Sequence, residues 1–370
     1  MDNASIRAAL TKAVDLGEIG IQVAAYRGED LILDSSIGEA QPGVPVSGDT
    51  LFPIFSVTKA LTLVAVHIQA ERGLVDYDDP IAAYWPEFAA HGKGGVTIRH
   101  VLTHRSGVPG MPSDTTPELM ADWNWMVTHL ADLEPLYPPG TKNAYASYSF
   151  GWLLGEVVRR TDPMHRPFCQ FVQDEVCRPI GVEELWLGLP PAEEERVAIL
   201  AGGYEEPTGR LRRLAVPPGI PIGPALFNLP LFHQACIPSA NGVANARSVA
   251  RFFAMLANGG ELGGVRLLSE ARVRSFTRLR PNSYEFDEIL NAVALVGEGG
   301  FWLSGNDPVV GDSPHVLLHT GGGGTYAWAD LDSRLAVAIL HNRMFTKASA
   351  HADGGSNHPF KQLGEAIRGV

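Results

Sequence analysis

The sequence Ser56-Val57-Thr58-Lys59 begins a run of apolar residues that predicts a buried helix over residues 58–72. A serine and a lysine three positions apart lie on the same face of a helix, so the amine would lie beside the hydroxyl. Burial would lower the pKa of the lysine, and a neutral amine can accept the serine proton. The helix N-terminus would favour the negative charge that develops there. The pattern therefore makes Ser56 a candidate nucleophile and Lys59 its candidate base; the alternative is a helix N-cap serine with a lysine in the first turn.

Composition limits the partners of the chain. It has 370 residues, of which 45% are hydrophobic, and a formal net charge of −12. The length suggests two domains, or one large domain with an insertion. The negative charge argues against nucleic acid or an anionic membrane as a partner, because both attract basic surfaces. No apolar run reaches the ~18 residues of a spanning helix, and the start lacks the pattern of a signal peptide. We therefore expect a cytoplasmic protein that acts on a small molecule; its oligomeric state stays open.

The three cysteines, Cys169, Cys177 and Cys236, do not form the even set of a disulfide framework. Cys169 and Cys177 are separated by about two helical turns. We expect these two cysteines in the core rather than in a bridge.

Strand patterns lie near both ends of the chain, and helical patterns dominate between them. The simplest architecture is an α+β fold: an antiparallel sheet from both termini, flanked by helices, with a mostly helical domain inserted. We expect the sheet domain to contain residues 1–75 and 205–370 and the inserted domain residues 76–204, with a site in the cleft between them. Residues 205–238, rich in proline and glycine, predict a long loop that shapes the site. The predicted strands are 19–26, 30–36, 292–296, 301–303, 316–319, 326–329 and 335–340, and the predicted helices include 4–16, 58–72, 151–160, 246–258 and 358–367.

Two further segments carry candidate chemistry. Tyr145–Ser147 precedes an apolar helix, and a tyrosine there can pass a proton when nearby cations lower its pKa. Tyr148, which begins a second Tyr-Ser pair, is the alternative. His319–Gly322 ends an apolar strand, and its glycines would let a substrate approach the backbone.

In this order, the three segments resemble the motifs of the serine β-lactamase and penicillin-recognising superfamily, on its class C side. The closest likeness is to the family VIII carboxylesterases and related transesterases. The resemblance covers residues 20–343 and implies the β-lactamase/transpeptidase-like fold. Its connecting segments are Phe52–Phe55, Val101–Gly107 (similar to the family's LLTHTSG turn), Pro138–Gly140, and Ile237–Gly242 (similar to a PSxNG stretch).

The resemblance implies a role for each matched residue. Ser56 would be the nucleophile, and Lys59 the general base or the group that keeps Tyr145 basic. Tyr145 would pass the proton to the leaving group and then activate water or an alcohol. The backbone N–H groups of Ser56 and Gly322 would form the oxyanion hole. His319 would line the pocket beside Lys59 and Tyr145, and no metal or cofactor is implied.

Three departures from the family bear on the substrate. The β-lactam-hydrolysing members have a lysine in place of His319, and a neutral imidazole binds a substrate carboxylate less well. Ser147 stands where asparagine is common, and it cannot make the same pair of contacts to an acylamino side chain. No secretory signal is visible. We therefore predict a carboxylesterase that acts on a small ester through an acyl-enzyme on Ser56, or transfers the acyl group to an alcohol or amine. The alternatives are a β-lactamase or D-amino-acid peptidase or amidase and, from another class, a binding protein without catalysis.

Aromatic and histidine residues supply the remaining candidates. Trp328, close to Gly322 in sequence, is the strongest candidate for the wall of an apolar acyl pocket. The pair His100 and His104 lacks the glutamate of a zinc-protease motif, so we predict a structural role. The other pocket candidates are Trp123, Trp125, Phe227 and Phe232, and the C-terminal group His351, Asp353 and His358 matches no zinc spacing.

Overall fold

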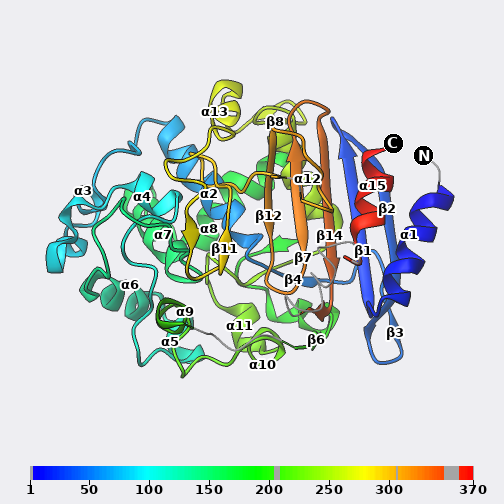
Figure 1. Cartoon of the computed structure of the whole chain (residues 1–370), viewed down its shortest axis with the longest axis horizontal. Coiled ribbons are helices and arrows are strands. Elements are labelled where there is room, and N and C mark those ends of the chain that lie inside the picture. Colours follow the sequence, from blue (N-terminus) through cyan, green and yellow to red (C-terminus); the bar gives the residue numbers. More distant parts are fainter. Residues whose placement is uncertain (1–2, 204–208, 306, 346–357, 370) are drawn as a thin grey trace.

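The computed structural model describes residues 3–203, 209–305, 307–345 and 358–369. Its largest sheet has six antiparallel strands in the order β12-β13-β14-β1-β2-β3, so both ends of the chain contribute to it (Figure 1). The predicted α+β class, with a sheet from both termini, is confirmed. The strands are β1 (Gly20–Arg27), β2 (Asp30–Gln41), β3 (Val44–Pro45), β12 (Val316–Thr320), β13 (Tyr326–Asp330) and β14 (Leu335–His341).

The central strands contribute side chains to two hydrophobic cores, because successive side chains of a strand point to opposite faces of the sheet. Val23 of β1 packs in a core with α1 and α15, whereas Ala24 lies in the core that also contains α2 and α12. Figure 1 shows α1 and α15 beside β1 and β2, at the end of the molecule where both termini lie. These helices are α1 (Asn3–Asp15), α2 (Thr58–Glu71), α12 (Ala246–Ala257) and α15 (Lys361–Arg368).

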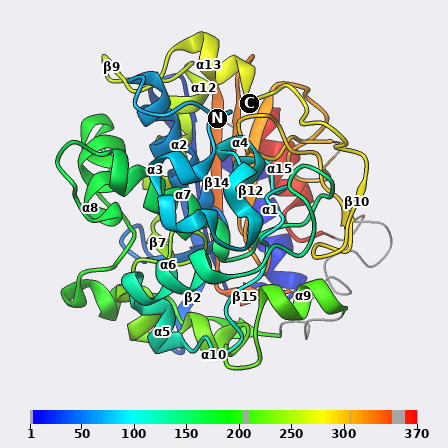
Figure 2. The same ribbon diagram turned by 90° about the vertical axis from the view of Figure 1, so that its left-hand side faces the viewer.

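α2 is buried along nearly its whole length, as its uniformly apolar sequence predicts. It packs against α7, and α3, α4 and α6 lie on the same side of the molecule, away from β1 and β2 (Figures 1 and 2). The helices of this region are α3 (Ile81–Tyr84), α4 (Ile98–Leu102), α5 (Pro117–Ala121), α6 (Trp123–Asp132), α7 (Ser149–Thr161) and α8 (Phe168–Val172); the short helix α13 (Glu270–Ser275) follows α12.

Short strands connect the predicted insertion to the rest of the chain. β4, which leads directly to Ser56, pairs with β7, and β7 pairs with β5. β5 and β6 lie inside the range 76–204 but pair with strands outside it, so the domain boundary stays a prediction. These strands are β4 (Phe52–Phe55), β5 (Leu185–Trp186), β6 (Ala201–Gly202), β7 (Gly242–Ala244) and β15 (Arg343–Met344), with separate pairs β8 (Glu261–Leu262) with β9 (Val265–Arg266) and β10 (Phe286–Asp287) with β11 (Ala292–Val293).

Two predicted elements are wrong. In the described part of the predicted loop 205–238, three short helices form, two of which have proline in the first turn, where its missing N–H costs nothing. The predicted strand 301–303 is reduced to isolated bridges from Trp302. The three helices are α9 (Arg210–Ala215), α10 (Pro224–Phe227) and α11 (Pro230–Gln234).

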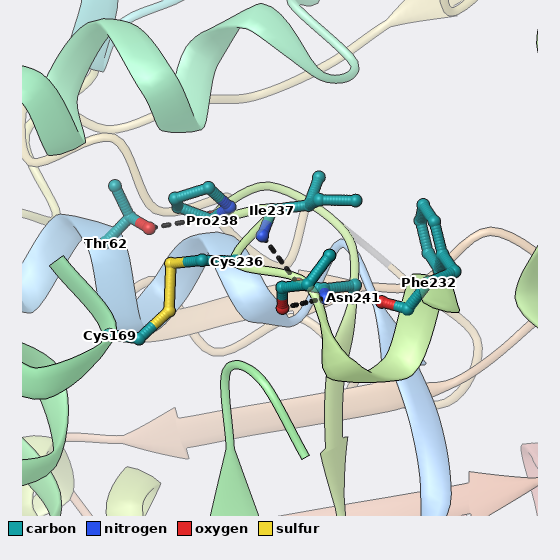
Figure 3. Close-up of a disulfide and its surroundings, with 8 residues drawn as sticks. Thr62, Cys169, Phe232, Cys236, Ile237, Pro238 and Asn241 are labelled. Carbon is teal, nitrogen blue, oxygen red and sulfur yellow. Dashed lines mark hydrogen bonds between the residues drawn. A yellow bond between two sulfur atoms is a disulfide. The ribbon is translucent and has the colours of Figure 1, made fainter. Parts of the chain in front are cut away.

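Cys169 is not a free core thiol, contrary to prediction. It forms a disulfide with Cys236, with Cα atoms 6.2 Å apart (Figure 3). The bridge joins α8 to the segment before Ile237–Gly242, and the two cysteines are 67 residues apart in the chain. Cys177 is free and buried, as predicted.

Candidate active site

Ser56 lies in a tight turn between β4 and α2. Phe55, directly before it, has a φ of +49°, a left-handed conformation that is rare for a bulky side chain. Thr58 holds the turn, because its hydroxyl donates to the carbonyl of Phe55 and accepts the N–H of Gly242 at 2.9 Å. Backbone strain of this kind occurs at functional sites, where the surrounding structure maintains it. The turn brings Ser56 to the wall of a cavity.

Lys59 is fully buried in the first turn of α2, with its amine 3.2 Å from the Ser56 hydroxyl. The amine also donates to the carbonyl oxygens of Ser147 at 2.7 Å and Ser239 at 2.9 Å. Burial lowers the pKa of Lys59 well below its usual 10.5. A neutral amine has two N–H groups for the two carbonyls and one lone pair for the Ser56 proton. This arrangement can activate Ser56 without a histidine.

The carbonyl of Ser239 is held in place by its own side chain. The Ser239 hydroxyl donates to the carbonyl of Tyr148 and accepts the N–H of Gly151, both at 2.7 Å. The Thr62 hydroxyl, on α2, donates to the neighbouring carbonyl of Pro238 at 2.6 Å (Figure 3). α2, α7 and this loop are therefore linked around the Lys59 amine. Tyr148, the alternative proton carrier, contributes its backbone carbonyl to this network. Tyr148 also lines the cavity.

Tyr145 lines the cavity, and the Lys59 amine lies 4.8 Å from the centre of its ring. His104 fixes the chain on both sides of Tyr145: its carbonyl accepts the N–H of Ala144 at 3.0 Å, and its Nδ1 accepts the N–H of Ala146 at 3.2 Å. The His104 and Tyr145 rings are 4.7 Å apart. Sequence reasoning assigned His104 a structural role without finding this contact; the positive φ of +55° at His104 is visible only in the structure.

The end of β12 lies against the turn before Ser56. A Cβ at Gly321 would lie 2.9 Å from the Cβ of Phe55, so only glycine permits this approach. Gly322, the next residue, lines the same cavity as Ser56. Within the described residues, the backbone N–H groups of Ser56 and Gly322 have no hydrogen-bond acceptor. Two free donors at this wall can stabilise an oxyanion.

His319 lies close to the site but does not line the cavity, contrary to prediction. It is fully buried, its ring stacks on Trp302 with centres 5.0 Å apart, and its Nδ1 donates to the carbonyl of Thr320 at 2.8 Å. Burial, together with the Lys59 charge, lowers the pKa of His319 to about 3. At neutral pH, His319 therefore presents no positive charge.

Trp328 does not contribute to the pocket, and this prediction is wrong. It is 1% exposed and lies in the core that contains α1 and α15. Across β13 and β14 it pairs with Val337, which lies in the same core. Closeness to Gly322 in sequence was misleading, because alternate residues of a strand face opposite sides of the sheet. Of the five aromatic candidates, Phe227 alone lines the cavity.

The cavity has a volume of about 480 Å³ and mostly apolar walls, and Ser147 contributes to it. Trp302, whose ring meets the Tyr145 ring edge-on at 5.7 Å, was missed because its segment was predicted only as a strand, with no sign of which cavity it borders. Other wall residues that the sequence did not single out come from distant segments and include Ile222, Leu290, Met344 and Phe345.

Within the described ranges, no group of three or more His, Cys, Asp or Glu residues could hold a metal ion, and no helix has the length and apolar character needed to span a bilayer. His351 and Asp353 lie outside the described residues.

A sheet from both termini, a buried helix that begins at a serine, and a lysine against that serine define a serine β-lactamase/transpeptidase-like protein. The sequence matches the β-lactamase family over residues 6–357, and the chain belongs to this family. It is 34% identical to "Esterase/beta-lactamase LipL" of Mycobacterium tuberculosis over 82% of this chain and 72% of the relative.

Solved structures agree with this assignment. A family VIII carboxylesterase is 31% identical, with a TM-score of 0.85 over 92% of both chains. A penicillin-binding protein homologue from Caulobacter crescentus is 30% identical, with a TM-score of 0.85 over 98% of this chain and 95% of the other. The predicted family and fold are therefore confirmed.

Proposed function

We propose that the chain is a serine carboxylesterase that forms an acyl-enzyme on Ser56. The observation that carries this proposal is the buried Lys59 amine, which is bound to two carbonyls and lies 3.2 Å from the Ser56 hydroxyl. Two relatives above 30% identity, an esterase/β-lactamase and a family VIII carboxylesterase, support an ester as the substrate.

In the first half-reaction, the Ser56 oxygen attacks the ester carbonyl and its proton passes to Lys59. The N–H groups of Ser56 and Gly322 stabilise the oxyanion. When the bond to the alcohol breaks, Tyr145 passes a proton to the departing oxygen. Water then attacks the acyl-enzyme with the same groups in reverse, which releases the acid and restores the Ser56 hydroxyl. An alcohol or amine in place of water gives acyl transfer.

The end of β12 carries no cation for the carboxylate of a β-lactam, which supports an ester as the substrate. His319 is buried and neutral, so no cation extends from this strand toward the carboxylate of a β-lactam. Ser147 offers no amide group to an acylamino side chain. The names of the relatives also include β-lactamase, and for this reason the alternative of lactam or amide hydrolysis is included in the test.

The first experiment uses p-nitrophenyl butyrate, nitrocefin and a fluorophosphonate probe. We expect ester turnover and a covalent adduct on Ser56, both abolished in Ser56→Ala with an unchanged circular dichroism spectrum. Ser5→Ala, at an exposed serine of α1, is the matched control and retains both. Nitrocefin turnover as fast as ester turnover would favour the β-lactamase alternative, and absence of both adduct and turnover would favour a binding protein.

The proton carrier is tested by comparing Tyr145→Phe with Tyr148→Phe. We expect Tyr145→Phe to reduce kcat by about a hundredfold or more, because it removes the transferable proton. Tyr148→Phe retains the backbone carbonyl that holds Ser239, so a smaller effect is expected. A larger loss in Tyr148→Phe would reverse the assignment.

The expected cytoplasmic location stays a prediction, and one observation bears against it. Disulfides such as Cys169–Cys236 persist in oxidising compartments and are rare in the cytosol. Alkylation of cells with a thiol-blocking reagent, followed by mass analysis of the protein, counts its free thiols. Three free thiols would favour a reducing compartment, and a single free thiol an oxidising one.

A further inference from the structure

α9 brings a positive charge to the catalytic cavity. Leu211 and Ala215, on its apolar face, are buried in one cluster with Tyr145. The carbonyl of Leu214 accepts the N–H of Met111 at 2.9 Å, which ties the helix to the helical region. α9 is thereby packed against the tyrosine of the site. Its residue Arg212 lines the same cavity as Ser56.

Arg212 differs from the other arginines of the described ranges. It is the one partly buried arginine there for which no side-chain hydrogen bond or ion pair is found. Its helix neighbours Arg210 and Arg213 are exposed and do not line the cavity. A guanidinium that has lost part of its water without gaining an acceptor is costly, so this group is available for a ligand.

The remaining charges of the cavity do not compete for this role. Among the described residues that line it, Arg212 is the sole lysine or arginine. The carboxylate of Asp307 is occupied, because it accepts the N–H groups of Val309 and Val310 at 2.8 and 3.0 Å and the hydroxyl of Tyr326 at 3.3 Å. The walls between the polar groups are mainly apolar and suit a methylene chain.

We propose that Arg212 binds a carboxylate carried by the substrate, and that the preferred substrates are esters with a second, ionised carboxyl group, such as hemiesters of dicarboxylic acids. This inference rests on the proposed esterase activity. A planar guanidinium binds a carboxylate through two parallel hydrogen bonds, which gives both affinity and orientation. The ester carbonyl would then meet Ser56 while the apolar wall covers the chain between the two groups.

The test compares two esters that differ in one charge: p-nitrophenyl hydrogen adipate and its neutral methyl ester. Adipate is used because shorter hemiesters cleave themselves through cyclic anhydrides. The measured quantity is the ratio of kcat/KM for the charged and the neutral ester on the same variant, so that a general loss of activity cancels. We expect a ratio above about ten for the natural chain, which is the strength of one charge-assisted contact. Added salt should reduce the ratio, because a partly exposed ion pair is screened.

Three variants complete the experiment. Arg212→Gln should reduce the ratio at least about tenfold, and Arg212→Glu should bring it below one by repelling the anion. Arg213→Gln, the adjacent exposed arginine, is the matched control and keeps the ratio of the natural chain. The same ratio is then measured with hemiesters of suberic and sebacic acid, which have longer chains. The chain length that gives the highest ratio indicates the distance from Ser56 to the guanidinium.

The outcomes separate the two proposals. Hydrolysis of the neutral ester with a ratio near one at every chain length, or a ratio unchanged in Arg212→Gln, overturns the role of Arg212 and leaves the esterase proposal intact. No hydrolysis of either ester overturns the esterase proposal and this inference together.

Discussion

Among the described residues, two lysines are fully buried, and their surroundings differ in one hydrogen-bond partner. The amine of Lys93 donates to three carbonyls, those of Ala90, Ala131 and Leu133, which satisfies all three hydrogens of an ammonium. The amine of Lys59 meets two carbonyls and the hydroxyl of Ser56. Burial lowers the pKa of both lysines, but only Lys59 has a partner with a proton to give. The third partner distinguishes a candidate base from a structural cation.

This difference predicts opposite signatures for Lys59→Met and Lys93→Met. Lys59→Met should reduce kcat/KM by about a hundredfold to ten-thousandfold, because it removes the base. Lys93→Met should lower the free energy of unfolding, since three buried carbonyls lose their donor, with kcat/KM of the folded protein near that of the natural chain. Ester kinetics and denaturant titration of both variants provide the check. Equal loss of activity in the two variants would contradict the assignment.

The pH dependence of activity follows from the same amine. Lys59 acts only when neutral, so activity should fall as pH drops through its folded pKa. Because burial holds that pKa well below 10.5, kcat/KM should reach its plateau far below pH 10.5. The pH profile of kcat/KM with a neutral ester measures this. A profile that stays flat down to about pH 5 would contradict the mechanism.

Of the residues at the site, those that are close in sequence could be predicted to lie together, and those that are far apart in sequence could not. Ser56 and Lys59 are three residues apart, so helix geometry alone brings them together. The carbonyls of Ser147 and Ser239 that orient the amine have no sequence signature, because every residue has a carbonyl. Their positions depend on how distant segments pack.

Among the elements, those with long apolar runs or periodic patterns could be predicted from sequence. The predicted helices 58–72 and 246–258 correspond to α2 and α12, and the predicted strand 335–340 to β14. α2 and β14 are continuous apolar runs that are buried on all sides, whereas α12 has the period of a helix with one buried face. α10 and α11 have too few residues for a period to appear. Their signal was the proline at the first turn, which we interpreted as a loop.

We expect the disulfide between α8 and the loop that contains Ser239 to stabilise the folded protein. It could not be foreseen, because the fold brings together cysteines 67 residues apart. Replacing both Cys169 and Cys236 by serine should lower the free energy of unfolding by up to about 4 kcal/mol, because the unfolded chain gains freedom. Activity at 25 °C should be largely retained, since Thr62, Tyr148 and Gly151 still hold the loop.

Denaturant titration with and without dithiothreitol measures the contribution of the bridge. The natural chain should lose the same free energy on reduction, and the double variant should not respond to the reductant. Equal stability of the oxidised natural chain and the double variant would contradict this expectation.

For the whole molecule, we expect buried histidines to make the free energy of unfolding depend on pH. Burial lowers the pKa of His67 and His319 to about 3 and that of His104 well below 6.5. The unfolded chain binds a proton at each of these groups near pH 6.5, whereas the folded chain does not. Between about pH 6.5 and pH 3, unfolding therefore takes up protons, and stability falls as pH falls.

From pH 7 to pH 5, His67 and His319 should each reduce the free energy of unfolding by about 2 kcal/mol, and His104 should act in the same direction. Urea titrations at both pH values measure the total. His67→Gln should make the loss smaller by about that amount. A loss that is the same in the natural chain and in His67→Gln would show that other groups cause the response to acid.

The place of β1 between β14 and β2 has a consequence for biosynthesis. β1 is translated more than 300 residues before its neighbour β14. Until then, β1 has an unpaired edge, and unpaired edges associate readily with other chains. The edge of β1 that pairs with β14 therefore stays open to association with other chains while the intervening residues are translated.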